Sequence, residues 1–189
     1  MDKKILILIL ILSVILISCK EKKYEINGFE VEKMDDNYYR IKLNVEKDMV
    51  RSIYYTNVRY DPKELKDINV DKDIKSKVLN SNQLYLVMNP NANYSGKVTI
   101  AALEIKKFVS NPLLWNKNAS AAFTEPYNGI ENFKIKKCDE SDINETVILF
   151  KTGDEDKVYF DNCIIVQGKD EEGMIRSADR LVLSLIGVY

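Results

Sequence analysis

Hydrophobic and polar residues alternate along several short segments of the chain, as they do in half-buried β-strands. The clearest segment is 38–45, where apolar side chains share one face and polar side chains the other. Residues 24–31 alternate less regularly and contain Asn27-Gly28, a pair that favours tight turns. The pattern predicts strands over 24–31, 38–45, 53–60, 83–88, 133–138 and 146–152, and a central strand within 157–168.

A second pattern, with apolar residues three or four positions apart, predicts helices over 71–79, 97–109 and 170–186. Asp71 is a candidate N-cap of the first helix and Asp170 of the last, which Gly187 ends. Residues 111–132 show neither pattern and are expected to be irregular. The predicted buried stripe of the middle helix is Val98, Ala101, Ala102, Ile105, Phe108 and Val109.

The order of these elements predicts the fold class. Strands twice lead into helices, which is typical of an α/β or α+β sandwich with a mixed sheet packed against helices. We expect one domain over residues 24–189, large enough to bury a substantial core. Residues 19–23 form a short polar tether in front of it.

Residues 1–18 predict the location of the protein. Two lysines precede the apolar run 5–17, an order typical of a secretory signal peptide. The tetrad Leu16-Ile17-Ser18-Cys19 resembles a lipobox, in which a peptidase cleaves before a lipid-modified cysteine. The alternative is a retained membrane anchor, although a span needs roughly 18 apolar residues or more. Either interpretation places the domain on the outer face of the cell membrane, lipid-anchored at Cys19 or single-pass.

Composition narrows the chemistry. The chain contains no histidine, which excludes Ser-His-Asp and Cys-His catalysis and zinc sites that use histidine. We predict no catalytic, cofactor-binding or metal-binding residues, although an enzyme that relies on carboxylates or lysines stays open. The 28 basic and 29 acidic residues give a net charge of −1, a near balance that argues against binding of nucleic acid, which requires a basic face.

The three cysteines fall into two groups, Cys19 in the predicted lipobox and the pair Cys138 and Cys163 in the predicted domain. If Cys19 carries lipid, Cys138 and Cys163 remain as a pair in a compartment that permits disulfides. We favour a disulfide between them, and the alternative is two buried free thiols.

Four polar segments are interpreted as structural. The acidic clusters 139–142 and 154–156 lack the ligand spacing of a calcium loop and are expected to be solvated turns. Residues 168–173 lack the glycine spacing of a phosphate loop and are expected to be a capped helix start. Asp179 is expected to pair with Arg176, three residues away, on a solvated helix face that also carries Arg180.

The tyrosines suggest a contact surface. Tyr38-Tyr39 and Tyr54-Tyr55 lie in predicted strands, so each pair points to both faces of a sheet. If one face is uncovered, it forms a tyrosine-lined surface suited to an envelope protein or a glycan; if helices cover both faces, the tyrosines belong to the core. Candidate glycosylation sequons begin at Asn93, Asn118 and Asn144, all in predicted loops or loop edges.

Residues 161–181 carry a resemblance. A strand with Cys163 runs through Gly168 into a helix that contains Ala178-Asp179-Arg180-Leu181. This segment resembles the closing segment of an uncharacterised family of archaeal membrane-associated, lipoprotein-like proteins. The resemblance implies an archaeal envelope location and one domain with the Cys138–Cys163 pair, and it brings no catalytic residues.

These observations predict a membrane-anchored extracytoplasmic protein that acts without catalysis in binding or in envelope assembly. The first alternative is a solute-binding or sensor lipoprotein. The second is a carboxylate-dependent envelope enzyme, such as one that cleaves glycans, which would need two carboxylates roughly 5–10 Å apart in a cleft.

Overall fold

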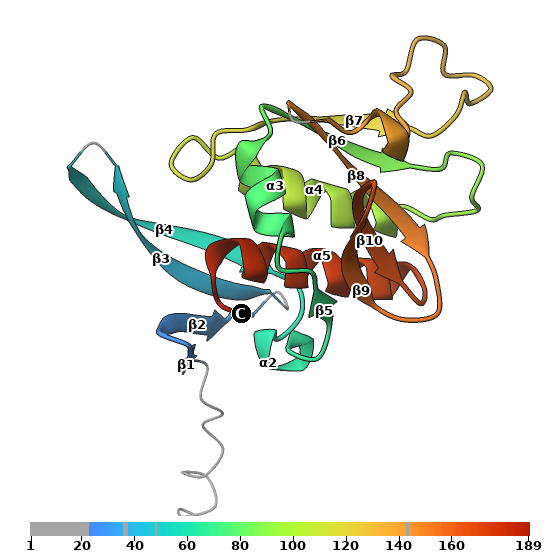
Figure 1. Ribbon diagram of the computed structural model, residues 1–189. Helices are drawn as coiled ribbons and strands as arrows, with labels where there is room; N and C mark the ends of the chain where they lie inside the picture. Colours follow the sequence, from blue (N-terminus) through green and yellow to red (C-terminus); the bar gives the residue numbers. More distant parts are fainter. Residues whose placement is uncertain (1–22, 36–37, 48, 143) are drawn as a thin grey trace, which may run out of the picture.

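In the computed structural model, the described residues form two β-sheets and four helices (Figure 1). The structure describes residues 23–35, 38–47, 49–142 and 144–189. The predicted signal or anchor segment 1–18 and Cys19 lie outside the described residues. Within them, no helix is both long enough and apolar enough to cross a membrane.

The first sheet is an antiparallel meander of four strands in chain order. Asn27 and Gly28 have φ angles of 48° and 85° and form a tight turn, so the predicted strand 24–31 is a hairpin of two strands. The predicted alternation along 38–45 is confirmed, since Ile41 and Leu43 are buried. The strands are β1 (Lys23–Ile26), β2 (Phe29–Lys33), β3 (Tyr39–Lys47) and β4 (Val50–Val58).

The second sheet is mixed, as predicted, and its order is β5-β9-β10-β8-β6-β7. All neighbouring strands are parallel except β9 and β10, which form an antiparallel hairpin. β10, predicted as a central strand, is buried along its whole length. The strands are β5 (Asn69–Val70), β6 (Gln83–Met88), β7 (Asn118–Phe123), β8 (Glu145–Thr152), β9 (Lys157–Asp161) and β10 (Cys163–Gly168).

The helices are α2 (Pro62–Leu65), α3 (Ile74–Asn80), α4 (Lys97–Val109) and α5 (Glu171–Ile186), with a 3-10 turn η1 (Cys138–Glu140). α4 has the predicted bounds, and all six residues of its predicted stripe are buried. The Asp170 carboxylate accepts a hydrogen bond from Gly173 N at 2.8 Å and caps α5, as predicted. The prediction for Asp71 is wrong: α3 begins after Asp73, and Asp71 instead accepts a hydrogen bond from Phe160 N.

Two predictions between α4 and β8 are also wrong. Residues 111–132 contain strand β7, whose small and polar residues carry little strand signal of their own. Residues 133–138 form no strand; a single bridge joins Phe123 to Ile135 before the chain turns into η1. Pairing with β6 orders β7 through the backbone, a long-range contact that sequence pattern does not reveal.

α5 lies between the two sheets and is buried on nearly all sides. Apolar side chains of the meander, the mixed sheet, α4 and α5 form one continuous core, including Ile41, Ile105, Leu183 and Ile164. The protein is therefore a single α+β domain in which one helix contributes to the packing of both sheets.

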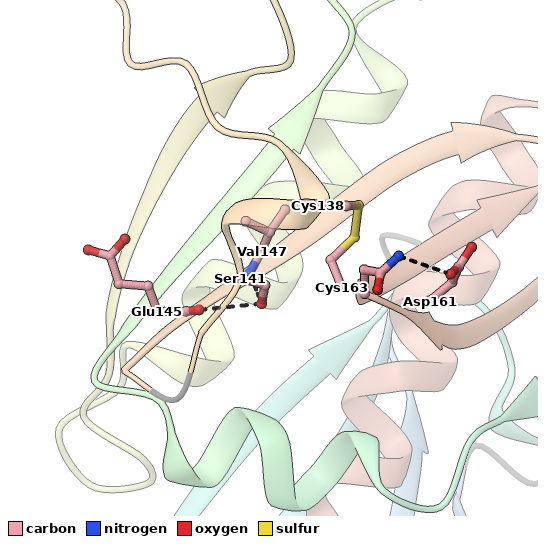
Figure 2. The surroundings of a disulfide bond; sticks show 7 residues. Cys138, Ser141, Glu145, Val147, Asp161 and Cys163 are labelled. Atoms are coloured by element: carbon pink, nitrogen blue, oxygen red, sulfur yellow. Dashed lines mark hydrogen bonds between the residues drawn. A yellow bond between two sulfur atoms is a disulfide. The ribbon is translucent and has the colours of Figure 1, made fainter.

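A disulfide joins Cys138 of η1 to Cys163 of β10, with the Cα atoms 4.9 Å apart (Figure 2). It lies on the face of the mixed sheet away from the helices, within a smaller apolar cluster that includes Tyr85 and Ile165. Beyond it, the Ser141 hydroxyl donates to the Glu145 carbonyl at 3.3 Å. The predicted pairing is confirmed, and it fastens residues 133–142 across this face.

Candidate functional site

The candidate site is a cleft of about 560 Å³ between the outer strand of the meander, β4, and helix α4. We call it the tyrosine cleft. Its lining includes Tyr38, Tyr54, Tyr55, Arg59, Glu104 and Lys107. The volume lies in the range of small-molecule sites.

Strand register explains how tyrosines reach the cleft. Tyr54 lies opposite Leu43, on the face of the meander that contacts the core, and is half-buried. Tyr55 lies opposite Lys42 on the other face and is 47% exposed. The two neighbours therefore meet the cleft from both sides of the β4 edge, and of the two alternatives left open by the sequence, the face that carries Tyr55 is uncovered.

Cations cover two of these rings. The Arg59 guanidinium lies 4.8 Å from the ring centroid of Tyr38, and the Arg40 guanidinium lies 5.5 Å from that of Tyr55. Such stacking fixes the tyrosine rings and adds positive charge along the cleft.

An ion pair between Arg59 and Glu104 closes one end of the cleft and joins the end of β4 to α4. The Glu104 side chain is largely buried at this point. Beneath it lies Asp179 of α5, which is 0% exposed and accepts hydrogen bonds from Arg59 N at 2.8 Å and Tyr60 N at 2.9 Å.

Glu104 and Asp179 form a buried pair of carboxyl groups that lie close enough to share a hydrogen bond when one of them is protonated. Burial raises the pKa of Asp179 well above its usual range, and the Glu104 carboxylate beside it raises this pKa further. Burial also raises the pKa of Glu104, against the lowering effect of Arg59. One oxygen of each group, Glu104 Oε2 and Asp179 Oδ1, is buried without another donor among the described residues. A proton shared between these two oxygens would satisfy both and would leave one negative charge for Arg59 to balance.

The expectation for the polar residues of α5 is corrected. Asp179 is not on a solvated face and does not pair with Arg176, which instead lies 3.4 Å from Asp156. Arg180 is buried and its guanidinium stacks on the Tyr189 ring at 4.6 Å. The signal was present in the sequence, because Asp179 stands between Ile175 and Leu183 in a row of apolar residues spaced four apart.

The carboxyl pair differs from the arrangement of a glycoside-cleaving enzyme. Those enzymes hold two carboxyl groups roughly 5–10 Å apart on either side of a substrate. Here Glu104 and Asp179 lie next to each other with no space for a substrate between them, and Asp179 has no exposed surface. The arrangement is suited to joining α4, α5 and the end of β4.

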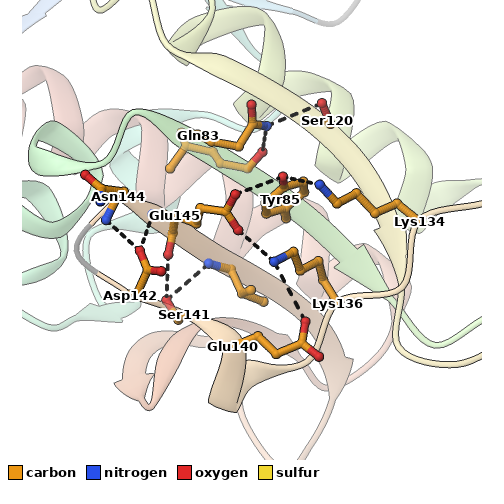
Figure 3. Close-up of polar contacts among 12 residues, drawn as sticks. Gln83, Tyr85, Ser120, Lys134, Lys136, Glu140, Ser141, Asp142, Asn144 and Glu145 are labelled. Carbon is orange, nitrogen blue, oxygen red and sulfur yellow. Dashed lines mark hydrogen bonds and ion pairs between the residues drawn. The ribbon is translucent and has the colours of Figure 1, made fainter.

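A second polar cluster lies where residues 133–142 cross the far face of the mixed sheet (Figure 3). The Tyr85 hydroxyl lies 3.3 Å from Glu145 Oε1 and also accepts a hydrogen bond from Lys134. Lys136 Nζ lies 2.7 Å from Glu145 Oε2 and 3.8 Å from Glu140 Oε2, and its ammonium lowers the pKa of Glu145. Because its charges are balanced internally, this cluster is suited to holding the segment on the sheet.

The remaining predicted residues are scattered over the surface. Asn93 and Asn144 are exposed in loops, whereas Asn118 is the exposed first residue of β7. In the acidic cluster 139–142, Asp142 accepts hydrogen bonds from the backbone of Asn144 and Glu145. In the described ranges, no group of three or more acidic, cysteine or histidine side chains is placed to hold a metal ion.

The residues of the cleft come from three separate parts of the sequence, and only the tyrosines were candidates on sequence grounds. Arg59 and Glu104 carry no local motif, and they meet because the meander and α4 pack on the same helix. Comparisons with protein-family models, curated proteins and solved structures find no match, so the cleft is interpreted from its own chemistry.

Proposed function

We propose that the protein is a membrane-anchored extracytoplasmic module that acts without catalysis in binding or envelope assembly. Its partner is a component of the envelope, which the resemblance of residues 161–181 makes an archaeal one. The observation that carries the proposal is the tyrosine cleft, because exposed tyrosines beside arginines are the side chains most enriched in binding surfaces. Anchoring rests on residues 1–18 and Cys19.

The first test maps contacts in cells that produce the full-length chain. A photo-crosslinking phenylalanine analogue replaces Tyr55 in the cleft, and in a control chain it replaces Tyr127, an exposed tyrosine in the loop after β7. We expect an adduct with an envelope component at position 55 alone. Equal adducts at both positions, or none at position 55, would contradict the proposal.

The second test concerns the anchor and the absence of catalysis. Mass spectrometry of the chain extracted from native membranes should find a covalent lipid on Cys19, or residues 1–18 retained. A soluble chain that begins after Cys19 would overturn the anchoring. Turnover in a broad hydrolase screen would overturn the non-catalytic role.

A solute-binding or sensor lipoprotein is the second candidate, and the volume of the cleft favours it. About 560 Å³ is enough for a small ligand. This candidate predicts a saturable rise in melting temperature with one member of a solute library, and the rise should be lost in Tyr55→Ala. Without such a member, the macromolecular role is preferred.

A further inference from the structure

The outer edge of β4 presents unpaired backbone groups. Lys47 and Val50 pair across a two-residue connection, so these two residues exchange backbone hydrogen bonds and every second residue of β4 faces β3. The hydrogen bond from Met34 N to Tyr38 O agrees with this assignment. It directs the backbone groups of Tyr38 toward β2, so those of Tyr39, the next residue, point toward β4. The residues whose N–H and C=O groups point away from the sheet are therefore Arg51, Ile53, Tyr55 and Asn57.

Nothing in the described part of the chain hydrogen bonds to these outward groups. The next outward N–H, that of Arg59, is bound by Asp179 at 2.8 Å, so one end of the edge already uses an acceptor from elsewhere. Most exposed edges are blocked by proline, charge or a bulge. Residues 52–57 contain no proline or charged side chain, and the β3–β4 register runs without a bulge.

Apolar surface accompanies this open edge. Ile53 and Tyr55 on β4 are 57% and 47% exposed, and Leu103, across the cleft on α4, is 54% exposed. An open strand edge beside exposed apolar side chains is the arrangement that receives an added strand in β-augmentation.

The charges of the cleft select the partner. Arg40 stacks on Tyr55, and Lys107 lines the cleft on the α4 side. The acidic group of the lining, Glu104, is already engaged by Arg59 and Asp179. A bound chain therefore meets exposed apolar surface at Leu103 on α4 and two cations, Arg40 beside Tyr55 and Lys107 on α4.

We propose that an extended, acidic segment of a partner protein adds to β4 as a fifth strand of the meander and fills the tyrosine cleft. This inference rests on the proposed function and names its partner class. A second copy of the chain fits less well, because pairing β4 with β4 would bring two sets of Arg40 and Lys107 together. Like charges across an interface oppose association.

The probe is a synthetic peptide of about eight residues that alternates glutamate and valine, the length of an ordinary strand. Binding to the full-length chain in detergent is followed by fluorescence polarisation. We expect saturable binding, and binding about tenfold weaker or absent for the matched peptide that alternates lysine and valine. Equal binding of the two peptides, or no binding of either, would overturn the inference.

Backbone pairing has a signature of its own. Two further peptides are methylated at alternate backbone nitrogens, one at each of the two possible sets. One set should weaken binding about tenfold, since it removes the donors that face β4, and the other should not. Amide exchange should slow in residues 50–58 and stay unchanged in 83–88. Exchange that slows elsewhere, or two methylated peptides that bind like the parent, would contradict strand addition.

Side-chain variants test the charge argument. Lys107→Glu should weaken peptide binding roughly threefold to fivefold, whereas Lys106→Glu, on the next residue of α4 and outside the cleft lining, should not. Equal effects of the two variants would show that only net charge matters and would overturn the assignment.

Failure of this inference is distinguishable from failure of the proposed function. A position-55 adduct with a glycan, or a dimer in sedimentation that Tyr55→Lys abolishes, would replace the acidic segment with another occupant and leave the binding role of the cleft standing. Loss of the position-55 adduct itself would remove both.

Discussion

Asp179, in α5, binds the backbone N–H of Arg59 at 2.8 Å across 120 residues of sequence. The same carboxylate oxygen accepts from Tyr60 N, and the other oxygen faces Glu104. One buried side chain thus fixes where the meander ends and where α4 lies beside it. The shape of the tyrosine cleft depends on this carboxyl group, although no ligand can touch it.

Asp179→Asn should be stable and should change the pH dependence of unfolding. The raised pKa of Asp179 in the folded state means that folding favours the protonated pair. This stabilisation is complete below the unfolded pKa near 3.9 and is lost as the pH rises through the folded pKa. The asparagine amide donates to Glu104 without a titrating proton. Urea unfolding from pH 5 to 9 should therefore show wild type losing stability relative to the variant, by at most about 1.4 kcal/mol per pH unit.

Asp179→Ala is the contrasting variant. It leaves the N–H groups of Arg59 and Tyr60 buried without an acceptor and should cost about 3 kcal/mol or more. A difference between wild type and Asp179→Asn that is constant with pH would show that the carboxyl pair holds no shared proton.

Gly168→Ala should destabilise the fold strongly. A Cβ at Gly168 would lie 2.1 Å from Met174 N, where strand β10 passes the first turn of α5. Because the contact is with backbone, the strand and helix must separate, and we expect a loss of about 3 kcal/mol in chemical unfolding. Gly96→Ala is the matched control: its Cβ meets nothing within 4 Å, and the change should be neutral or slightly stabilising. Similar losses at both glycines would refute the packing argument.

Reduction of the Cys138–Cys163 disulfide should lower the free energy of unfolding without unfolding the protein at room temperature. The bridge spans a separation of 25 residues. Closing a loop of that size stabilises by about 3 kcal/mol in the chain-entropy model. Unfolding curves with and without a phosphine reductant measure the loss, and Cys138→Ala with Cys163→Ala should reproduce it. An unchanged midpoint of the unfolding curve would mean that polar contacts alone hold residues 133–142 on the sheet.

Asp170→Ala should cost about 1 kcal/mol, because its carboxylate caps α5 through Gly173 N. Asp73 begins α3 without a side-chain capping bond, so Asp73→Ala should have little effect. Thermal or urea unfolding of the two variants gives the comparison. An equal loss of stability in the two variants would indicate that negative charge near the start of a helix, rather than the capping hydrogen bond, stabilises the helix.

Elements with a strong local pattern were predictable from sequence. α4 and β6 were predicted with their bounds, and α5 with both its cap and its terminal glycine, because periodicity and capping residues are local signals. β7 was not, since Asn118-Ala119-Ser120-Ala121-Ala122 has little preference for a strand and is ordered by its pairing with β6.

The candidate site was predictable only in part. The neighbouring tyrosines in predicted strands indicated that tyrosine side chains lie on both faces of a sheet. The arrangement of Arg59, Glu104 and Asp179 could not be predicted in this way, because it depends on contacts between residues far apart in the chain. Asp179 looked like an exposed residue because charged residues on helices usually are. The position of Asp179 between Ile175 and Leu183, in a row of apolar residues spaced four apart, was the sequence feature that indicated burial.

The position of α5 between the sheets has a consequence for how the chain is made. Every strand of both sheets is synthesised before α5, yet their common core is incomplete until that helix arrives. We expect the chain to stay loosely structured through most of its synthesis, because long-range contacts contribute only once the last partner is present. If the chain is exported as proposed, this delay keeps it unfolded enough to pass through a narrow channel. Folding is then completed on the far side of the membrane, once α5 has arrived.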